Sequence, residues 1–176
     1  TGGRIYPCYF IPGGVRRDLP EGFREETLKA LDYIENQMKL YDNLVFYNTT
    51  FTMRLENVGI LRAEDAVALG ITGPNLRASG VATDVRKDEP YDAYPHVDFK
   101  VVSLEKKDAY SRALCRRGEI FESTSIVKQL LEKMPEGDFR VKWGLTKKVP
   151  SGEAYFCCEA ARGELCFHMV SDGTER

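Results

Sequence analysis

The stretch PEGFREETLKALDYIENQMKLYD, residues 20–42, carries the clearest structural pattern of this sequence. Its apolar side chains recur at every third or fourth position, which places them on one face of a helix: Leu28, Leu31, Ile34, Met38 and Tyr41. Pro20 suits a first helical turn, where a missing N–H breaks no hydrogen bond. Asp18 and Glu21 have the spacing of a capping box. The pattern predicts an amphipathic helix from about 20 to 42.

A second long helical pattern covers residues 107–133. Its apolar positions are Leu114, Phe121, Ile126, Val127, Leu130, Leu131 and Met134. Gly118 weakens this helix locally, and Pro135 with Gly137 ends it. Between the two long helices, the apolar pattern of residues 44–56 fits either a helix or a strand, and we favour a shorter helix. Residues 63–69 are predicted as another, terminated by Gly70.

The carboxyl-terminal part has the alternation of a strand pair. Apolar and polar side chains alternate over residues 154–159, and an apolar run from Leu165 to Val170 follows Arg162-Gly163. This pattern predicts a β-hairpin of short strands around a four-residue turn. Another short strand is expected around Phe99 and Val101. The chain is therefore predicted to be one α+β domain over 1–176, with two long helices of a helical bundle, a long ordered loop and a small β-hairpin.

Composition and charge exclude several classes of protein. Of the 176 residues, 43% are hydrophobic and 30% are charged, which is typical of a globular domain. The formal net charge is −2, with 25 basic and 27 acidic residues well mixed. Such a chain has no overall field to attract nucleic acid or anionic lipid. We therefore expect no nucleic-acid partner.

The cysteines and histidines do not form a recognisable metal or catalytic motif. The five cysteines lack C-x-x-C spacing: Cys8, Cys115, Cys157, Cys158 and Cys166. Adjacent side chains of a strand point to opposite faces, so Cys157 and Cys158 make a poor chelate. His96 and His168 lie in unlike surroundings and are expected to be surface or structural residues. The sequence thus predicts no metal site, no bound cofactor and no catalytic residue within this chain.

Residues 71–96 form the longest stretch without a regular pattern, and ordered loops of this length tend to be functional. The region around this loop concentrates arginines, carboxylates and phenols. Such groups either bind an anionic ligand or form a buried network that fixes the loop. We favour a structural polar network made by Arg77, Asp84, Arg86, Tyr91, Asp92 and Tyr94.

Four sequence stretches give more specific information about this chain. TGGRIYPCYFIPGGVRRDLP at 1–20, RAEDAVALGITGPNLRASGVATDVRKDEPYDAY at 62–94, KQLLEKMPEG at 128–137 and VPSGEAYFCCEAARGELCFHMVSDGTER at 149–176 carry the resemblance. Together they resemble the 49-kDa (D) subunit of NADH:quinone oxidoreductase, the respiratory complex I family. The same superfamily includes F(420)H(2) dehydrogenase subunits and the large subunits of [NiFe] hydrogenases.

This resemblance implies roles for the first twenty residues. Arg4 matches an arginine of the family's first motif, and the loop near the cluster-bearing partner, on the quinone side, is matched by Pro12, Gly13, Gly14 and Asp18. Tyr6 stands where the family usually has a histidine, and Ile11 where it usually has an arginine. A phenol has an unperturbed pKa of about 10, so Tyr6 is not expected to take up a proton with cluster reduction near neutral pH as imidazole could.

The resemblance also implies a place in an assembly. The family's protein lies in the hydrophilic arm, packs on the subunit carrying the terminal [4Fe–4S] cluster, and walls the quinone pocket with it. Its quinone-contacting residues precede the first motif present here. We therefore expect 1–176 to be an internal fragment of a peripheral subunit on the cytoplasmic side of the membrane, inactive alone. The short joint over 137–150 resembles archaeal and hydrogenase-related members, which favours F(420)H(2) or ferredoxin over NADH as the electron donor, and the choice among the three stays open.

Two other interpretations stay open at this point. One is the large subunit of an energy-converting [NiFe] hydrogenase, whose metal would be held by C-x-x-C pairs near the ends of the whole protein. The other is a structural docking module without chemistry. In each case the apolar helix faces of a fragment would lack partners, so we expect the chain to self-associate as a homodimer or higher oligomer.

Overall fold

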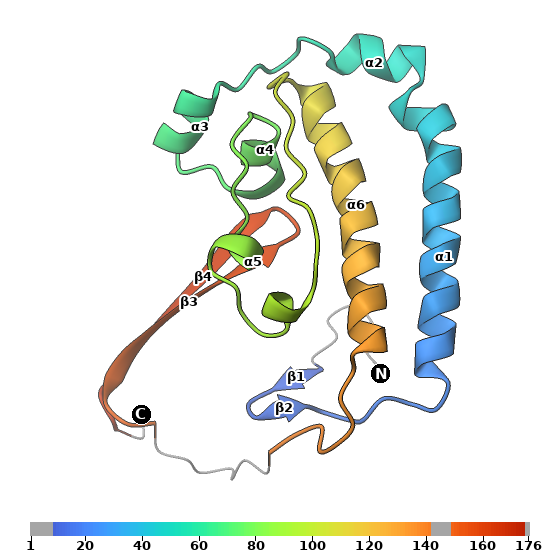
Figure 1. Cartoon of the computed structure of the whole chain (residues 1–176). Helices are drawn as coiled ribbons and strands as arrows, with labels where there is room; N and C mark the ends of the chain where they lie inside the picture. Colours follow the sequence, from blue (N-terminus) through green and yellow to red (C-terminus); the bar gives the residue numbers. More distant parts are fainter. Residues whose placement is uncertain (1–8, 142–148, 175–176) are drawn as a thin grey trace.

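The computed structural model describes residues 9–141 and 149–174, so Arg4 and Tyr6 lie outside the described residues. Helices and antiparallel strands both occur, which confirms the predicted α+β class. Figure 1 shows the elements in chain order: β1 (Phe10–Ile11), β2 (Gly14–Val15), α1 (Phe23–Tyr41), α2 (Thr49–Leu55), α3 (Ala63–Ala68), α4 (Gly73–Arg77), α5 (Val85–Asp88), α6 (Ala109–Glu132), β3 (Gly152–Ala160) and β4 (Gly163–Ser171).

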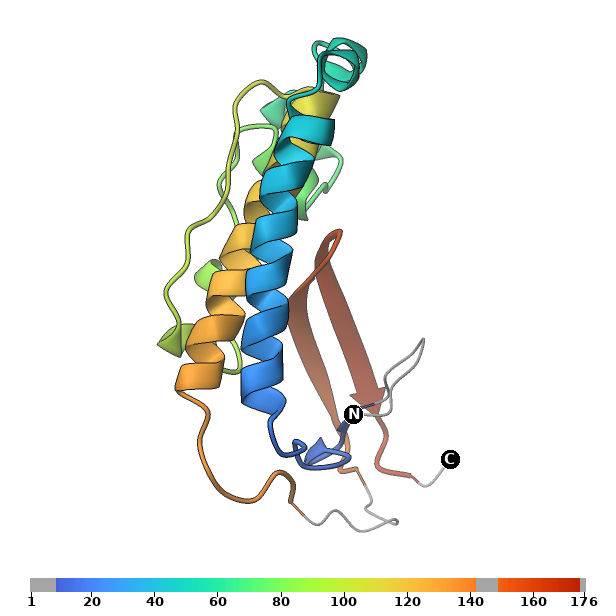
Figure 2. The same cartoon turned by 90° about the vertical axis from the view of Figure 1, so that its right-hand side faces the viewer.

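The two long helices lie side by side in both orientations (Figure 1, Figure 2). Leu31 and Met38 of α1 are buried, as are Ile126 and Leu131 of α6. Ion pairs join the middle of α1 to the carboxyl-terminal part of α6, where Lys128 Nζ donates to Asp32 Oδ1 at 2.8 Å and to Glu35 Oε1 at 2.9 Å. Both helices therefore agree with the predicted ranges 20–42 and 107–133 to within three residues.

The start of α1 differs from the predicted capping box. Gly22, at φ 74°, is the N-cap residue and supplies no side-chain hydrogen bond. Asp18 Oδ1 accepts instead from the N–H of Leu19 at 2.8 Å, four residues before the helix begins. The prediction was wrong because the left-handed turn that Gly22 makes possible shifts the first helical residue to Phe23.

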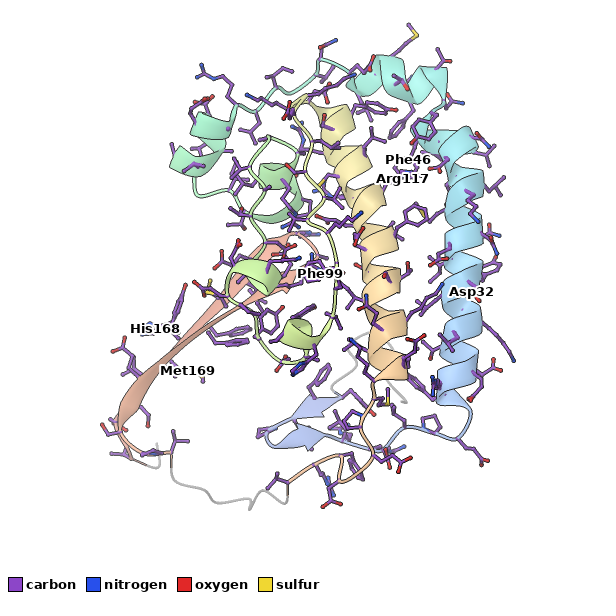
Figure 3. All side chains as sticks on the ribbon, viewed as in Figure 1. Asp32, Phe46, Phe99, Arg117, His168 and Met169 are labelled. Carbon is purple, nitrogen blue, oxygen red and sulfur yellow. The ribbon has the colours of Figure 1, made fainter. Side chains whose placement is uncertain are left out.

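The predicted helix over 44–56 is broken into two pieces. A π-helical turn, Asp42–Phe46, continues α1, and α2 follows after Asn48, whose side-chain oxygen accepts from Thr50 N at 2.9 Å. An Asn in an extended conformation with such a bond is a favourable N-cap, which explains the break. Figure 3 shows Phe46 and Arg117 between the upper ends of α1 and α6. Arg117 forms a paired hydrogen bond with Asp42 across this gap.

The strand expected around Phe99 and Val101 is absent from the described residues. Residues 97–104 are extended but run along α6, whose side chains take the place of a neighbouring strand. The N–H of Asp98 donates to Gln129 Oε1 at 2.8 Å, and the N–H of Lys100 to Glu122 Oε2 at 2.9 Å. Side chains of α6 accept these backbone hydrogen bonds, so the segment does not need a neighbouring strand to satisfy its N–H groups. The strand prediction was therefore wrong.

Gly118 explains how this segment approaches α6 closely. A Cβ at position 118 would lie 2.8 Å from Val102 Cγ1, which is closer than two carbon atoms can approach. The glycine that the helical pattern marked as a weak point is therefore the place where the extended segment packs.

The hairpin is longer and tighter than predicted. β3 and β4 pair antiparallel from Gly152↔Ser171 to Ala160↔Gly163, which leaves a two-residue turn in place of the expected four-residue one. Its tip is fixed to the start of α4, where a Cβ on Gly73 would lie 2.2 Å from Gly163 Cα. The far part of the hairpin extends away from the helices, and Figure 3 labels His168 and Met169 there.

Buried apolar side chains are few, and large ones remain exposed on α1, the π-helical turn, α2 and the hairpin: Tyr33, Leu40, Leu44, Met53, Tyr155, Phe167, Met169 and Val170. Among the described residues, none of the helices combines the length and the hydropathy needed to cross a membrane.

Candidate functional site

The loop joining β1 to β2 is held by the segment that follows α6. Gly13 O accepts from Val141 N at 2.8 Å, and Val15 N donates to Phe139 O at 3.2 Å. Gly14 has φ 146°, and a Cβ there would lie 2.5 Å from Phe139 O. Only glycine fits this position, because both the backbone angle and the close neighbour exclude a side chain.

Of the predicted cluster-side residues, Pro12 and Gly13 form the tight turn of this loop, and Gly14 begins β2 directly after it. Asp18 lies after β2, exposed, and its carboxylate is used locally by Leu19. Figure 1 shows the turn near the lower end of α6, whereas α4 lies beside its upper half. The loop and the polar residues of 77–94 are thus two separate regions.

Arg77, in α4, is the centre of the polar network, and its side chain is 1% exposed. Its guanidinium donates to Glu119 Oε1 at 2.8 Å through Nε and to Glu159 Oε1 at 2.7 Å through Nη2. Nη1 donates to the carbonyl of Thr83 at 3.0 Å. One side chain therefore ties α4 to α6, to β3 and to the loop before α5.

Asp84 and Arg86 extend the network. Asp84 Oδ1 and Oδ2 accept from Arg86 Nε and Nη2 at 2.9 and 2.6 Å, and Oδ2 lies 3.5 Å from Arg77 Nη1. Asp84 also caps α5 by accepting from the N–H of Arg86 at 3.0 Å. The Arg86 guanidinium lies 5.1 Å from the ring centre of Phe99, which Figure 3 labels beside α5. The aromatic face adds a cation–π contact.

The two tyrosines join the network at its hairpin side, and Asp92 does not. Tyr91 Oη accepts from the N–H of Glu159 at 3.0 Å, and its ring meets Tyr94 edge-on at 4.9 Å. Asp92 is exposed at φ 47°, in the turn between the two tyrosines. Its inclusion in the network was wrong: asparagine and aspartate tolerate the left-handed conformation, and this residue serves the turn.

The network contains two guanidinium groups and three carboxylates, and the pKa values of two of these carboxyls, Glu159 and Asp84, move in opposite directions. Burial raises the pKa of Glu159, and the hydrogen bond from Arg77 offsets only part of that effect. Burial alone would raise the pKa of Asp84 too, but hydrogen bonds from Arg86 and its charge leave it below the ordinary value. Glu159 therefore takes up a proton more readily than Asp84.

A pocket of about 280 Å³ lies beside the network. Its wall is rich in carboxylates: Asp84, Asp88, Glu89, Glu159 and Glu164. Arg77 donates into the protein, and every buried side-chain nitrogen and oxygen of the described residues has a hydrogen-bond partner. An anionic ligand would meet carboxylates here, so the geometry favours the structural network over the anion-binding alternative.

Sequence reasoning missed Glu119 and Glu159, the two carboxylates that hold Arg77. They lie 42 and 82 residues away from Arg77 in the chain, in a helix and a strand whose local patterns do not mark them. Cys115 is fully buried one turn before Glu119, and burial raises the pKa of its thiol to about 12.

Comparison with known proteins decides the family. The sequence model described as the 49-kDa subunit of respiratory-chain NADH dehydrogenase matches residues 1–147, which is most of the chain. The chain belongs to this family. The matched residues include the β1–β2 loop and four members of the polar network: Arg77, Asp84, Arg86 and Glu119. Glu159 lies beyond the matched residues.

Curated relatives match the chain along its whole length. It is 43% identical over 180 residues to the (D) subunit of NADH-quinone oxidoreductase from Thermosipho melanesiensis, covering 100% of this chain and 49% of the relative. It is 39% identical over 182 residues to the (D) subunit of F(420)H(2) dehydrogenase from Methanosarcina mazei, with the same coverage. The identity is also 39% over 202 residues with a (D) subunit of NADH-quinone oxidoreductase from Rhizobium meliloti, covering 100% and 50%.

A solved structure agrees with this 49-kDa family assignment. A chain of the membrane-bound sulfane sulfur reductase, an archaeal respiratory membrane complex, is 42% identical and superposes with a TM-score of 0.92. The match covers 98% of this chain and 48% of that chain. The chain therefore spans about half the length of the relatives it matches, both curated and structural.

Proposed function

We propose that this chain forms part of the electron-transfer and quinone-site scaffold subunit of a complex I-like membrane oxidoreductase. The observation that carries the proposal is the agreement of sequence and fold: 43% identity to the (D) subunit of an NADH-quinone oxidoreductase, and a TM-score of 0.92 to a respiratory membrane complex. Since function belongs to sites rather than folds, the two regions described above need roles of their own.

The first role is docking. The loop of Pro12, Gly13 and Gly14, with Asp18 after it, faces a partner subunit that carries the [4Fe–4S] cluster nearest the acceptor. The geometry supports this role because the turn is rigid: its backbone is bonded to 139–141, and Gly14 admits no alternative residue. By resemblance, Arg4 and Tyr6 are proposed to serve the same docking role. The partner subunit then holds the [4Fe–4S] cluster, and the two subunits together hold the quinone.

The second role is support. The Arg77 network fixes 77–94 against α6 and the hairpin, so that the family's long loop keeps one conformation while partners bind. The exposed apolar side chains of α1, such as Tyr33 and Leu40, pack in the whole protein against further helices of a bundle. The comparisons do not favour the [NiFe] hydrogenase or the isolated docking module. In this proposal the assembly's hydrophilic part lies peripherally, on the cytoplasmic side of the membrane.

A second acceptor chemistry is favoured by one specific observation. The solved structure that is 42% identical to this chain is a sulfane sulfur reductase rather than a quinone reductase. The same scaffold therefore serves complexes with different acceptors. The electron donor, whether NADH, F(420)H(2) or ferredoxin, would be set by other subunits of the assembly.

The test is isolation of the complex from native membranes through a tag on this protein. We expect co-purification of an iron–sulfur subunit, and donor-dependent reduction of a quinone. Reduction of polysulfide without quinone reduction would select the second chemistry. Gly14→Ala should lower turnover and weaken retention of the iron–sulfur subunit, whereas Gly152→Ala, which has open space around it, should do neither. A tagged protein that brings down no redox subunit would refute the proposal.

A further inference from the structure

One face of the β3–β4 hairpin gathers three metal-ligating side chains. Cys157 of β3 stands directly opposite Cys166 of β4, and Glu164 lies two residues before Cys166 on the same face. The two sulfur atoms and a carboxylate oxygen of Glu164 all lie within 4.8 Å of one another. Cys166 Sγ is 3.3 Å from Glu164 Oε1. The adjacent Cys158 belongs to the other face of the strand, opposite Leu165.

The pairing of the strands explains why the two sulfurs come together. A two-residue turn is closed by a hydrogen bond between its flanking residues, Ala160 and Gly163, and bonded and non-bonded pairs alternate from there. The next pair, Glu159 and Glu164, is non-bonded, because its N–H groups point outward to Tyr91 Oη and Thr72 Oγ1, each at 3.0 Å. Cys157 and Cys166, two pairs further, are also non-bonded, and such pairs bring side chains closest.

The position is also fixed in space. The hairpin tip is clamped by the contact of Gly163 with Gly73 and by the bond from Glu164 N to Thr72. On the β3 side, the Glu159 carboxylate is bound by Arg77. The three side chains therefore project from a backbone anchored within a few residues of them, which reduces the ordering that a bound ion would impose.

We propose that Cys157, Glu164 and Cys166 form a binding site for one soft divalent metal ion of the zinc type. Thiolates select such ions over magnesium or calcium, and zinc accepts both cysteine sulfur and carboxylate oxygen as ligands. On binding, the two thiols release their protons to solvent. Three protein ligands leave a fourth position for water or an external ligand. Cys157 is buried and Cys166 is exposed, so this open position faces outward. The proposal is independent of the proposed redox function.

The test measures metal in the protein purified with its partner subunits, wild type and variants side by side. Zinc and iron are quantified separately by mass spectrometry after incubation with zinc chloride and dialysis. We expect about one zinc ion per chain in wild type beyond that of Cys166→Ser, and zinc X-ray absorption should show sulfur at about 2.3 Å. Iron content should be unchanged, which separates this site from clusters borne by partners.

Cys158→Ser is the matched control, because it removes a thiol from the same strand but from the opposite face. It should retain zinc, whereas Cys157→Ser and Cys166→Ser should lose it. Glu164→Gln, an exposed change that preserves the hairpin, should bind zinc roughly tenfold or more weakly. It keeps the test decisive if the buried Cys157→Ser fails to fold. Equal zinc in wild type and all three ligand variants, no zinc in wild type, or a Cys157–Cys166 disulfide in the purified protein would each overturn the proposal.

Discussion

At the scale of single residues, Arg77 has the most consequential environment in the chain. Its guanidinium is removed from solvent and compensated by Glu119, Glu159 and the Thr83 carbonyl. A buried ion pair need not be worth more than an apolar contact of the same shape, but breaking one side of it is costly because the remaining charges stay buried. The network should therefore be sensitive to changes in any one member.

We predict that Arg77→Met lowers the free energy of unfolding by about 3–5 kcal/mol, since it strands two carboxylates away from water. Urea denaturation followed by circular dichroism measures the change. Arg62→Met is the control: Arg62 also pairs with a carboxylate, that of Asp65, but both are exposed, so the loss should be far smaller. Equal effects of the two substitutions would contradict the importance of burial.

Because the pKa of Asp84 is lowered and that of Glu159 is raised, the two carboxyls should make the free energy of unfolding change with pH in opposite directions. The pKa of Asp84 is lowered in the folded protein, so its contribution is present above its unfolded pKa of about 3.9 and is lost as the pH falls through the folded pKa. Asp84→Asn should thus be less stable than wild type at pH 6. The gap should close in acid, where wild-type Asp84 is protonated as well.

Glu159→Gln should show the opposite trend relative to wild type. The pKa of Glu159 is raised by burial, so its contribution is largest below its unfolded pKa and declines as the pH rises through the folded value. Unfolding free energies of wild type and both variants, measured from about pH 3 to 7, give the two slopes directly. Slopes of the same sign would show that the two carboxyls are not differently tuned.

At the scale of elements, contacts between segments override local propensity. Residues 97–104 lie on α6 as an extended chain without strand partners, and Gly118 provides the space for Val102. Alanine is preferred over glycine within a helix by about 1 kcal/mol. Here the preference is outweighed, because a methyl group at 118 would overlap a stiff, β-branched side chain.

We predict that Gly118→Ala lowers the unfolding free energy by about 1–3 kcal/mol despite its better helix propensity. Combining it with Val102→Ala should cost less than the sum of the two single changes, because the smaller side chain leaves room for the new methyl. Thermal or urea unfolding of the four proteins completes the cycle. A stabilised Gly118→Ala single variant would mean that Val102 simply moves aside.

At the scale of the whole molecule, the described residues leave many large apolar side chains exposed to solvent. Tyr33 and Leu40 of α1, Leu44 of the π-helical turn and Met53 of α2 have exposed fractions between 49% and 77%. The hairpin is a two-stranded ribbon whose far end is open on both faces, and such ribbons are only marginally stable alone. The fold thus offers surfaces for neighbouring segments or subunits.

The isolated chain is therefore predicted to self-associate. Light scattering at tens of micromolar should report a dimer or larger species, and Leu40→Glu combined with Leu44→Glu should shift it towards monomer, since charges on the α1 face oppose apolar association. Lys29→Glu, on an exposed polar position of the same helix, serves as the control. A monomer at that concentration without any substitution would contradict the prediction.

The sequence by itself determined the elements whose contacts are local, together with the family. Helical spacing placed α1 and α6 to within three residues, and alternation placed the hairpin, because each pattern reflects neighbours close in the chain. Only the tertiary structure decided which side chains from distant parts of the chain come into contact. Glu119 and Glu159 reach Arg77 from 42 and 82 residues away, and Cys157 meets Cys166 rather than Cys158, because strand register and helix packing set those distances. The periodicity of the sequence contains no information about such long-range contacts.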